Sequence, residues 1–242
     1  AYFGDPDNLQ VDLSKLLEPE YLSERRRQMS STSRSNVHLG NTSEISESTE
    51  TTHFSVIDQW GGAVSCTTTL NSNFGAKVMA AGILFNNEMD DFAAQPGKAN
   101  QFGLVQSSAN AIVPGKRPLS SMAPTIVLQD GKVDAIIGSP GGPTILSTVL
   151  QVILNRYVFD MNPLRAVSAP RFHRQDLPIY IKHEWNRIDT ATRNRLRQFN
   201  QPLKQVSGLG LVNAIFNYNG KWHAIADKRG DGWAQSMLEN KL

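Results

Sequence analysis

The sequence predicts an α+β fold in which helices flank antiparallel sheets, and three features of the chain lead to that expectation. Apolar and polar residues alternate over His53–Asp58 and again over Ala63–Leu70, which is typical of two half-buried strands. Asp130-Gly131 and Asn219-Gly220 are strong signals for two-residue hairpin turns. Thr144–Phe159 carries apolar residues at helical spacing. Strands that precede helices, with a hairpin at the end, favour antiparallel layers.

The composition is that of an ordinary globular protein. The 242 residues are 40% apolar and 19% charged, with a formal net charge of +2. These values exclude collagen-like, coiled-coil and fully disordered chains and give no whole-molecule field that would attract nucleic acid. The one cysteine, Cys66, excludes an internal disulfide framework and a multi-cysteine zinc site. A chain that begins at Ala1, with no initiator Met or signal peptide, is expected to be a processed product or a fragment.

The first fifty residues divide at a change in composition. Leucines over Leu13–Leu22 have the spacing of short helices. The run Arg25–Arg27 is expected to be a solvated helix face rather than a nucleic-acid patch. Ser30–Glu50 contains ten Ser or Thr among 21 residues and has too little apolar surface to offset the entropy of ordering. The expected units are residues 1–29, an exposed linker over 30–50 and a main domain over 51–242.

The first two strands are expected to form a hairpin that brings threonines together. A loop of about four residues, Gln59–Gly62, joins them. The register that follows places Thr51 opposite Leu70, beside Thr69 and Asn71. A sheet edge rich in threonine, a residue type that suits strands, is the alternative interpretation. The remaining expected elements are strands at Gly82–Phe85, Thr125–Leu128, Val133–Ile137, Val212–Tyr218 and Trp222–Ala226, and a helix over Thr190–Phe199.

Metal and phosphate sites have weak support in this sequence. The five histidines are scattered, and Glu88, Asp90 and Asp91 lack the spacing of a calcium loop, so we expect no metal. Gly138–Gly142 precedes the long helix but lacks the lysine and hydroxyl residue of a phosphate-binding loop, so we expect no cofactor. Ser139 does not stand in a Gly-x-Ser-x-Gly elbow, which disfavours a Ser/His/Asp triad.

Two features of the chain suit acyl transfer. The adjacent backbone N–H groups of Gly141 and Gly142 stand at a helix start, where they suit either an oxyanion hole or a tight turn. At Glu50-Thr51 the polar linker runs directly into the first strand. Cleavage there would give Thr51 a free α-amine, with a reference pKa of about 7.7–8.0, that can accept the proton of its own hydroxyl. No separate histidine is then needed.

Six motifs in a fixed order carry a resemblance to one enzyme family. They are Thr51–Val56, Thr69–Asn71, Gly82–Phe92, Lys116–Met122, Gly138–Gly142 and Ala169–His173. Together they closely resemble the γ-glutamyltransferase family, also called glutathione hydrolases, within the N-terminal-nucleophile hydrolases. The resemblance is dense from Thr51 to about His173, and thinner at Tyr2–Asp7 and around Gly220–Trp233.

The resemblance implies a fold and a maturation step. Such enzymes have an αββα sandwich and are made as one precursor that cleaves itself before the catalytic threonine, here Thr51. The chain is then expected to be the C-terminal part of a precursor: the tail of the large subunit over 1–29, the linker over 30–50 that ends at the cleavage site, and the small catalytic subunit over 51–242. Its sandwich is expected to be incomplete without the upstream large subunit, which is the implied partner. The resemblance also implies export to the periplasm or the cell exterior.

The same resemblance assigns roles in glutathione hydrolysis and γ-glutamyl transfer. Thr51 attacks the γ-amide carbon of glutathione or another γ-glutamyl compound, and Thr69 helps to activate Thr51. Water, or an acceptor amino acid or peptide, then releases the γ-glutamyl group. The implied binding residues are Asn71, Glu88 and Asp91 for the substrate α-ammonium, Ser120 and Ser121 for its α-carboxylate, and Gly141 and Gly142 for the oxyanion. Three of these assignments also have an ordinary structural interpretation: Asp90-Asp91 as a solvated turn, Ser120-Ser121 as a polar strand start, and Gly141-Gly142 as a helix-entry turn.

The sequence departs from the family at two places and leaves two rival functions. Pro143-Thr144 stand where the family usually has a small hydroxyl residue and an arginine, and Gly75–Ala81 is slightly shorter than in many relatives. Asp90 and His173 are expected to be structural. One rival is a related acylase of other amides, such as a cephalosporin-type enzyme. The other is an inactive fragment or an interaction module. Ser120-Ser121 and the Glu88/Asp91 pair argue for a substrate with an amino-acid head group and against a plain acyl chain.

Overall fold

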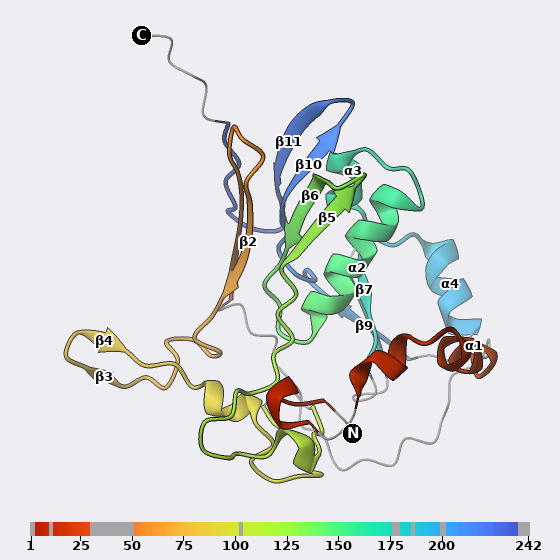
Figure 1. Ribbon diagram of the computed structural model, residues 1–242. Helices are drawn as coiled ribbons and strands as arrows, with labels where there is room; N and C mark the ends of the chain where they lie inside the picture. The colour runs from red at the N-terminus through yellow and green to blue at the C-terminus, as the bar shows by residue number, and fades with distance from the viewer. Residues whose placement is uncertain are drawn as a thin grey trace.

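Two antiparallel sheets lie against each other, and helices cover the outer face of one of them (Figure 1). The computed structural model describes residues 3–9, 12–29, 51–101, 104–175, 180–184, 187–198 and 202–236. The expected linker over 30–50 therefore lies outside the described residues. The smaller sheet pairs β1 (Thr52–Ile57) with β2 (Ala63–Thr68), and the larger sheet has the strand order β11-β10-β6-β5.

Two tight hairpins build the four-stranded sheet. β5 (Thr125–Gln129) pairs with β6 (Lys132–Gly138), and β10 (Asn213–Tyr218) pairs with β11 (Lys221–Ala226). Both residues of each turn have positive φ, 51° and 74° at Asp130-Gly131 and 53° and 72° at Asn219-Gly220. Asn-Gly and Asp-Gly turns with two positive φ angles match the right-handed twist of the flanking strands. The structure confirms both predicted hairpins.

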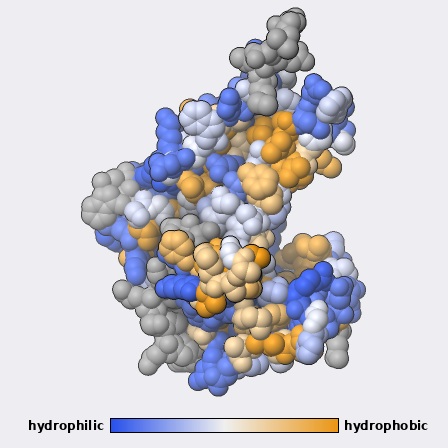
Figure 2. Space-filling view, turned by 90° about the vertical axis from the view of Figure 1, so that its left-hand side faces the viewer, coloured by the Kyte–Doolittle hydropathy of each residue, from blue (hydrophilic) through white to orange (hydrophobic). Residues whose placement is uncertain are grey.

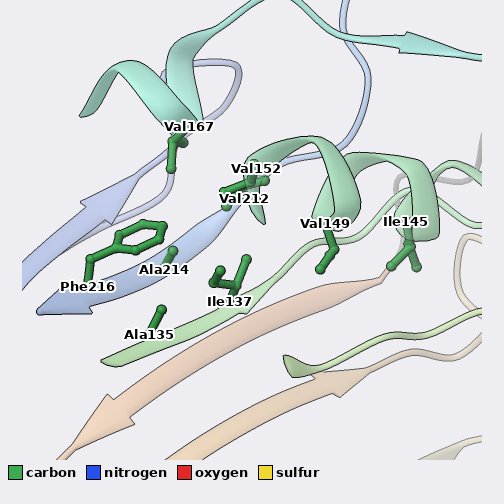
Figure 3. Close-up of a cluster of buried hydrophobic side chains, with 9 residues drawn as sticks. All are labelled: Ala135, Ile137, Ile145, Val149, Val152, Val167, Val212, Ala214 and Phe216. Carbon is green, nitrogen blue, oxygen red and sulfur yellow. The ribbon is translucent and has the colours of Figure 1, made fainter. Parts of the chain in front are cut away.

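Two helices pack against one face of this sheet. α2 (Thr144–Tyr157) begins where predicted and ends two residues earlier, and α3 (Pro163–Ser168) follows it. Burying a Val, Ile or Phe side chain contributes roughly 1.5–3 kcal/mol each, so the cluster between helices and sheet dominates the stability of this layer. Figure 3 shows its members: Ala135, Ile137, Ile145, Val149, Val152, Val167, Val212, Ala214 and Phe216.

The β1–β2 hairpin has a register that differs by one residue from the prediction. Ile57, not Asp58, lies opposite Ala63, and Thr52 lies opposite Thr68. The Asp58 carboxylate accepts hydrogen bonds from the backbone N–H groups of Trp60 and Gly62, at 2.9 and 2.7 Å, and the Asp58 N–H donates to the Gly62 carbonyl. These bonds make a three-residue loop, and Gly61 within it has φ +88°.

This register sets which threonine faces Thr51. Extended by one residue beyond the strands, it places Thr69, rather than the predicted Leu70, opposite Thr51. The predicted proximity of Thr51 to Thr69 is nevertheless confirmed, because their hydroxyl oxygens lie 3.1 Å apart.

The outer face of the hairpin carries exposed apolar side chains. Phe54, Val56 and Val64 are each about half exposed, and Figure 2 views the molecule from this side, with hydrophobic residues interspersed among polar ones. No helix covers this face within the described ranges (Figure 1). Three of the four layers of an αββα sandwich are therefore present in that part of the chain, in agreement with the predicted incomplete sandwich.

Smaller elements surround the two sheets. Helix α1 carries exposed Arg25–Arg27, as predicted. A third sheet pairs β8 with β7 in antiparallel and with β9 in parallel orientation, a parallel pairing that the sequence did not predict. The expected strand near Gly82 is a short hairpin of β3 and β4. The remaining bounds are η1 (Pro6–Asn8), η2 (Leu13–Leu17), α1 (Pro19–Arg27), β3 (Met79–Ala80), β4 (Ile83–Leu84), η3 (Glu88–Asp91), η4 (Ser108–Asn110), β7 (Phe172–His173), β8 (Ile181–Glu184), α4 (Thr190–Gln198) and β9 (Leu203–Val206).

A buried ionic cluster joins the third sheet to the segment that follows β11. Arg171 pairs with Asp227 at 2.7 Å, and Arg229 pairs with Asp227 at 3.0 Å and with Glu184. All four side chains are at least 96% buried. Burial alone would raise the pKa of Asp227, but Arg171 and Arg229 hold it below its usual value. Because an unpaired buried charge costs several kcal/mol, the cluster is expected to depend on all its members.

None of the helices within the described ranges is both long and apolar enough to cross a bilayer. Those ranges also contain no group of three or more His, Cys, Asp or Glu side chains placed to hold a metal ion.

Candidate active site

One cavity of about 630 Å³ collects most of the predicted site residues. It lies where the start of β1, the loops that follow β2, and the start of α2 meet. The structure places Glu88 and Gly141 beside this cavity, next to lining residues but outside the lining itself. The predicted residues that line it are Thr51, Thr69, Asn71, Asp91, Ser120, Ser121 and Gly142.

Thr51 is buried at the head of β1. Its side chain hydroxyl donates a hydrogen bond to the Thr69 hydroxyl oxygen at 3.1 Å. The Thr69 oxygen also accepts from the Asn71 N–H at 2.9 Å. Asn71 reaches this position with φ +71°, a left-handed conformation that asparagine tolerates better than most residues. Thr69 therefore connects the Thr51 hydroxyl to the chain reversal that follows β2.

The chain reversal at Asn71 is tied to the acidic turn η3. The Asn71 amide nitrogen donates to the Asn87 carbonyl at 3.1 Å, and the Asn87 amide oxygen accepts from the Ser72 N–H at 2.9 Å. η3 begins directly after Asn87. These bonds fix the acidic turn relative to the threonine pair, since Thr69 and Asn87 both hydrogen-bond to Asn71.

Glu88 and Asp91 form a carboxyl pair at the cavity wall. Burial, with further contributions from Glu88, raises the pKa of Asp91 to about 7. Burial also raises the pKa of Glu88, and its Oε1 is buried without a hydrogen-bond partner among the described residues. Two partly desolvated carboxyls so close together favour sharing one proton near neutral pH. A bound cation would favour the fully ionised pair.

The serine pair ends a well-anchored loop. Ser120 is exposed, and its hydroxyl oxygen accepts from the Met122 N–H at 3.1 Å. Just before it, the Leu119 N–H donates to the amide oxygen of the fully buried Asn110 at 3.0 Å. Both serines line the cavity, and their hydroxyl groups are of a kind that binds a carboxylate.

The Gly141-Gly142 turn leads into α2. Its φ angles are +133° and +52°, values that favour glycine, and a Cβ on Gly141 would lie 2.6 Å from the Thr144 hydroxyl oxygen. The Gly141 carbonyl accepts from the Thr144 N–H at 3.0 Å and from its hydroxyl at 2.8 Å. Thr144 is thus turned inward, and Pro143 lines the cavity in its place. The start of a helix contributes a positive dipole at this wall.

Ser139 has no nucleophilic geometry, as predicted. The side chain is fully buried, its hydroxyl donates to the Pro140 carbonyl at 2.7 Å, and its oxygen accepts from the Leu211 N–H at 2.8 Å. These bonds hold the glycine turn against the loop before β10. Its role is structural.

Sequence reasoning placed His173 outside the site, whereas the structure places it in the cavity wall. Its Nδ1 lies 2.8 Å from the Ser147 hydroxyl and its Nε2 lies 2.8 Å from the Gln175 side-chain oxygen. Leu146 and Leu150 line the same wall. Leu146, Ser147 and Leu150 share one helix face, so the spacing of exposed leucines within the apolar helix was the signal that could have identified this wall.

The chain matches the family described as Gamma-glutamyltranspeptidase over residues 1–237. It is 47% identical over 182 residues to the glutathione hydrolase proenzyme of Pseudomonas aeruginosa. The matched region covers 73% of this chain and 32% of that relative. It is 45% identical over 188 residues to the corresponding proenzyme of Escherichia coli, with 76% and 32% covered. The chain thus spans about a third of the length of these relatives. A putative inactive glutathione hydrolase 4 of Arabidopsis thaliana is 39% identical over 188 residues, with 75% of this chain and 98% of that relative covered.

Solved structures show the same relationship. The T380A mutant of Helicobacter pylori gamma-glutamyltranspeptidase superimposes with a TM-score of 0.71 at 45% identity, covering 74% of this chain and all of that chain. Cephalosporin acylase from Bacillus halodurans has a TM-score of 0.78 at 21% identity, covering 98% of this chain and 42% of that one, and shows the fold alone. The chain therefore belongs to the γ-glutamyltranspeptidase family and has the fold of the N-terminal-nucleophile hydrolases.

Proposed function

We propose that this chain carries the nucleophile of a γ-glutamyltransferase that acts on glutathione and related γ-glutamyl amides. The observation that carries the proposal is the buried Thr51 hydroxyl, bonded to Thr69 at 3.1 Å in a cavity that also holds carboxyl and serine groups. This set offers a nucleophile together with groups for both charges of an amino-acid head group. Plain acyl substrates would leave those polar groups without partners.

The proposed maturation step is cleavage of the Glu50-Thr51 bond. It leaves residues 1–29 and 30–50 on the upstream chain, proposed as the end of a large subunit, and residues 51–242 as the small subunit. The new α-amine of Thr51 has a reference pKa of about 7.7–8.0, so a useful fraction is neutral at physiological pH. That amine can take the proton of the Thr51 hydroxyl, as in other threonine nucleophiles with a free N-terminus.

The proposed reaction then proceeds through an ester on Thr51. The hydroxyl oxygen bonds to the γ-carbonyl carbon while its proton passes to the α-amine, and the developing oxyanion lies near the N–H groups of Gly141 and Gly142. The C–N bond breaks, and the leaving amine takes the proton from the α-ammonium. Water, or the amine of an acceptor amino acid or peptide, attacks the ester and regenerates the threonine.

Recognition is proposed to use the two polar ends of the cavity. Asn71, Asp91 and Glu88 bind the substrate α-ammonium, which neutralises a carboxyl pair that is otherwise partly protonated. Ser120 and Ser121 donate hydroxyl hydrogen bonds to the α-carboxylate.

The decisive experiment compares Thr51→Ala with the wild-type form of the complete protein that contains residues 1–242. We expect wild type to cleave before Thr51, to release the aniline from γ-glutamyl anilide, and to show one γ-glutamyl group on the Thr51 peptide by mass spectrometry. Thr51→Ala is expected to lose all three. An active enzyme without the hydroxyl would contradict the proposal.

Two rivals have their own outcomes in this experiment. Faster turnover of glutaryl anilide, which lacks the α-ammonium, would favour an acylase of other amides. Failure of the complete protein to cleave before Thr51 would favour an inactive chain, the property named for the Arabidopsis thaliana relative. Location in the periplasm or outside the cell is proposed on the family resemblance alone, and fractionation of the producing cells tests it.

A further inference from the structure

We propose that the segment Phe3–Asn8, which precedes the proposed cleavage site, positions the serine pair of the active site through an ion pair between Asp5 and Arg117. This inference rests on the proposed function for the substrate that the serines bind. Asp5 and Arg117 are called the N-terminal clamp below. Its members are positioning residues, because neither of them lines the cavity.

The clamp is centred on a buried carboxylate. The Asp5 side chain is 2% exposed. Its Oδ2 accepts from the Arg117 backbone N–H at 2.9 Å, and its Oδ1 accepts from the guanidinium Nη2 at 2.6 Å and Nε at 3.1 Å. The same Nη2 reaches the exposed carboxylate of Asp7 at 2.6 Å. Side-chain hydrogen bonds from Arg117 lower the pKa of Asp5 well below its usual value.

The backbone at Gly4, next to Asp5, also lies against the rest of the protein. A Cβ on Gly4 would lie 2.2 Å from the Ala109 carbonyl oxygen, so only glycine lets the two segments approach this closely. The Lys116 ammonium also donates to that carbonyl, at 2.7 Å. Phe3 lines the active-site cavity directly. The segment therefore docks against the Ala109–Arg117 stretch by shape as well as by charge.

Two bonded links run from the clamp to the substrate groups. Asp5 holds the Arg117 backbone, and two residues later the Leu119 N–H donates to Asn110 at 3.0 Å. Ser120 and Ser121 follow immediately. The fully buried Asn110 also donates to the Asp91 carbonyl at 2.7 Å, which ties the serine loop to the acidic turn. Loss of the Asp5 contact would release the serine loop at Arg117 and leave it held at Leu119, by the bond to Asn110.

This arrangement has a consequence for the proposed cleaved enzyme. After the Glu50-Thr51 bond is broken, the clamp becomes a contact between two chains. The ion pair then keeps Phe3 in the cavity wall and holds a serine loop that belongs to the other chain. The upstream chain thereby contributes to recognition of the substrate carboxylate.

The test uses Asp5→Asn in the complete protein, with Asp7→Asn as the matched control. The asparagine keeps the shape of Asp5 but places an NH₂ group and no charge before the guanidinium. For γ-glutamyl anilide we expect KM to rise about tenfold with kcat changed less than about twofold, because an interaction used for binding is weakened. For 4-aminobutyryl anilide, which lacks the α-carboxylate, we expect no change in KM. Asp7→Asn is expected to stay within about twofold of wild type on both substrates.

A second measurement reports on the serine loop and does not depend on enzymatic activity. In Asp5→Asn, hydrogen exchange at the amides of Arg117, Leu119 and Met122 is expected to accelerate, while exchange in the β10–β11 hairpin stays unchanged. If wild type does not turn over γ-glutamyl anilide, the proposed function fails, and this exchange measurement still decides whether the clamp anchors the loop.

Other outcomes would overturn the inference. Unchanged exchange and unchanged KM in Asp5→Asn would show that the clamp does not position the serines. An equal loss on both anilides would show a general structural role instead. Should Asp5→Asn fail to fold, Arg117→Gln replaces it, because that side chain is 65% exposed and its backbone bond to Asp5 is retained. In Arg117→Gln the changes in KM and in hydrogen exchange are expected to have the same direction as in Asp5→Asn and to be smaller.

Discussion

The two faces of the four-stranded sheet are held by different kinds of contact. On the side of α2 and α3, apolar side chains such as Val152 and Phe216 are fully buried and interlock (Figure 3). On the side of the β1–β2 hairpin, side-chain hydrogen bonds join the two sheets: Ser65 to the Ile137 carbonyl at 3.2 Å, Ser55 to the Asn213 carbonyl at 3.2 Å, and the Asn213 amide to the His53 carbonyl at 2.9 Å.

This difference indicates that one face of the sheet mainly stabilises the fold and the other mainly positions the β1–β2 hairpin. Apolar burial is non-directional and contributes in proportion to the area removed from water. Hydrogen bonds contribute only about 1 kcal/mol each, but they fix distance and orientation. The hairpin that begins at Thr51 is thus placed by the directional face, while the non-directional face holds the fold together. Substitutions on the two faces should therefore differ in both size and kind of effect.

The largest effect is expected on the apolar face. Phe216→Ala removes a fully buried ring and should lower the free energy of unfolding by about 4 kcal/mol, measured by urea denaturation. Leu128→Ala, in β5 of the same sheet, is the control, because Leu128 is 60% exposed and should change the free energy by less than about 0.5 kcal/mol. Equal losses would contradict the assignment of stability to the buried face.

The next effect is a pH dependence on the polar face. Burial lowers the pKa of His53 to about 4, and its two ring nitrogens lie 2.8 Å from the Thr67 hydroxyl and 3.1 Å from the Ser55 hydroxyl. Below about pH 6.5 the unfolded chain protonates this histidine and the folded chain does not, so stability is lost as the pH falls from about 6.5 to 4. The loss attributable to His53 is roughly 3 kcal/mol over that range.

Urea denaturation at several pH values, in wild type and His53→Gln, measures this contribution. The difference between the two curves removes the carboxyl groups that titrate in both proteins. We expect the wild-type curve to fall more steeply toward acid. Parallel curves would mean that His53 titrates normally and is not sealed between the sheets.

A steric change at the same place is expected to have a smaller effect on stability. A Cβ on Gly138 would lie 2.2 Å from the His53 ring, and that ring is held at both nitrogens. Gly138→Ala should therefore lower the free energy of unfolding by about 2 kcal/mol. It should also lower the proposed acyl-transfer activity, because a shift of His53 would move Thr51, which is two residues away in the chain. Gly208→Ala is the control, since its Cβ would have no neighbour closer than 3.8 Å and no loss is expected.

Local signals explain which parts of the fold could be predicted. The Asp130-Gly131 and Asn219-Gly220 turns and the apolar period of α2 are contained in short stretches, and the structure confirms them. The β1–β2 register was wrong by one residue because the Asp58 carboxylate caps the turn. These capping bonds come from a side chain, and the alternation of apolar and polar residues along a strand does not indicate them.

Long-range contacts explain what could not be predicted. Arg171 and Asp227 are 56 residues apart in sequence and meet in a buried ion pair, and β8 pairs in parallel with β9 across α4. For the candidate site, family motifs supplied seven of the residues that line the cavity, whereas His173, although it ends the motif Ala169–His173, was expected to be structural and not part of the cavity wall. Asp5 was not predicted as part of the site because the residues around it in sequence do not reveal its partner 112 residues away.

The smallest effect on stability is expected when a single hydrogen bond between the hairpin and the four-stranded sheet is removed. Ser65→Ala removes the bond to the Ile137 carbonyl and should lower the free energy of unfolding by about 1 kcal/mol. Thr68→Ala, on the exposed face of the same strand, should change it by less than about 0.5 kcal/mol. If the inner hydroxyls position the hairpin together, Ser55→Ala combined with Ser65→Ala should be non-additive, since these two residues lie directly opposite each other. Strict additivity would mean that each bond holds its own strand and that the position of Thr51 depends on His53 and Asn213 instead.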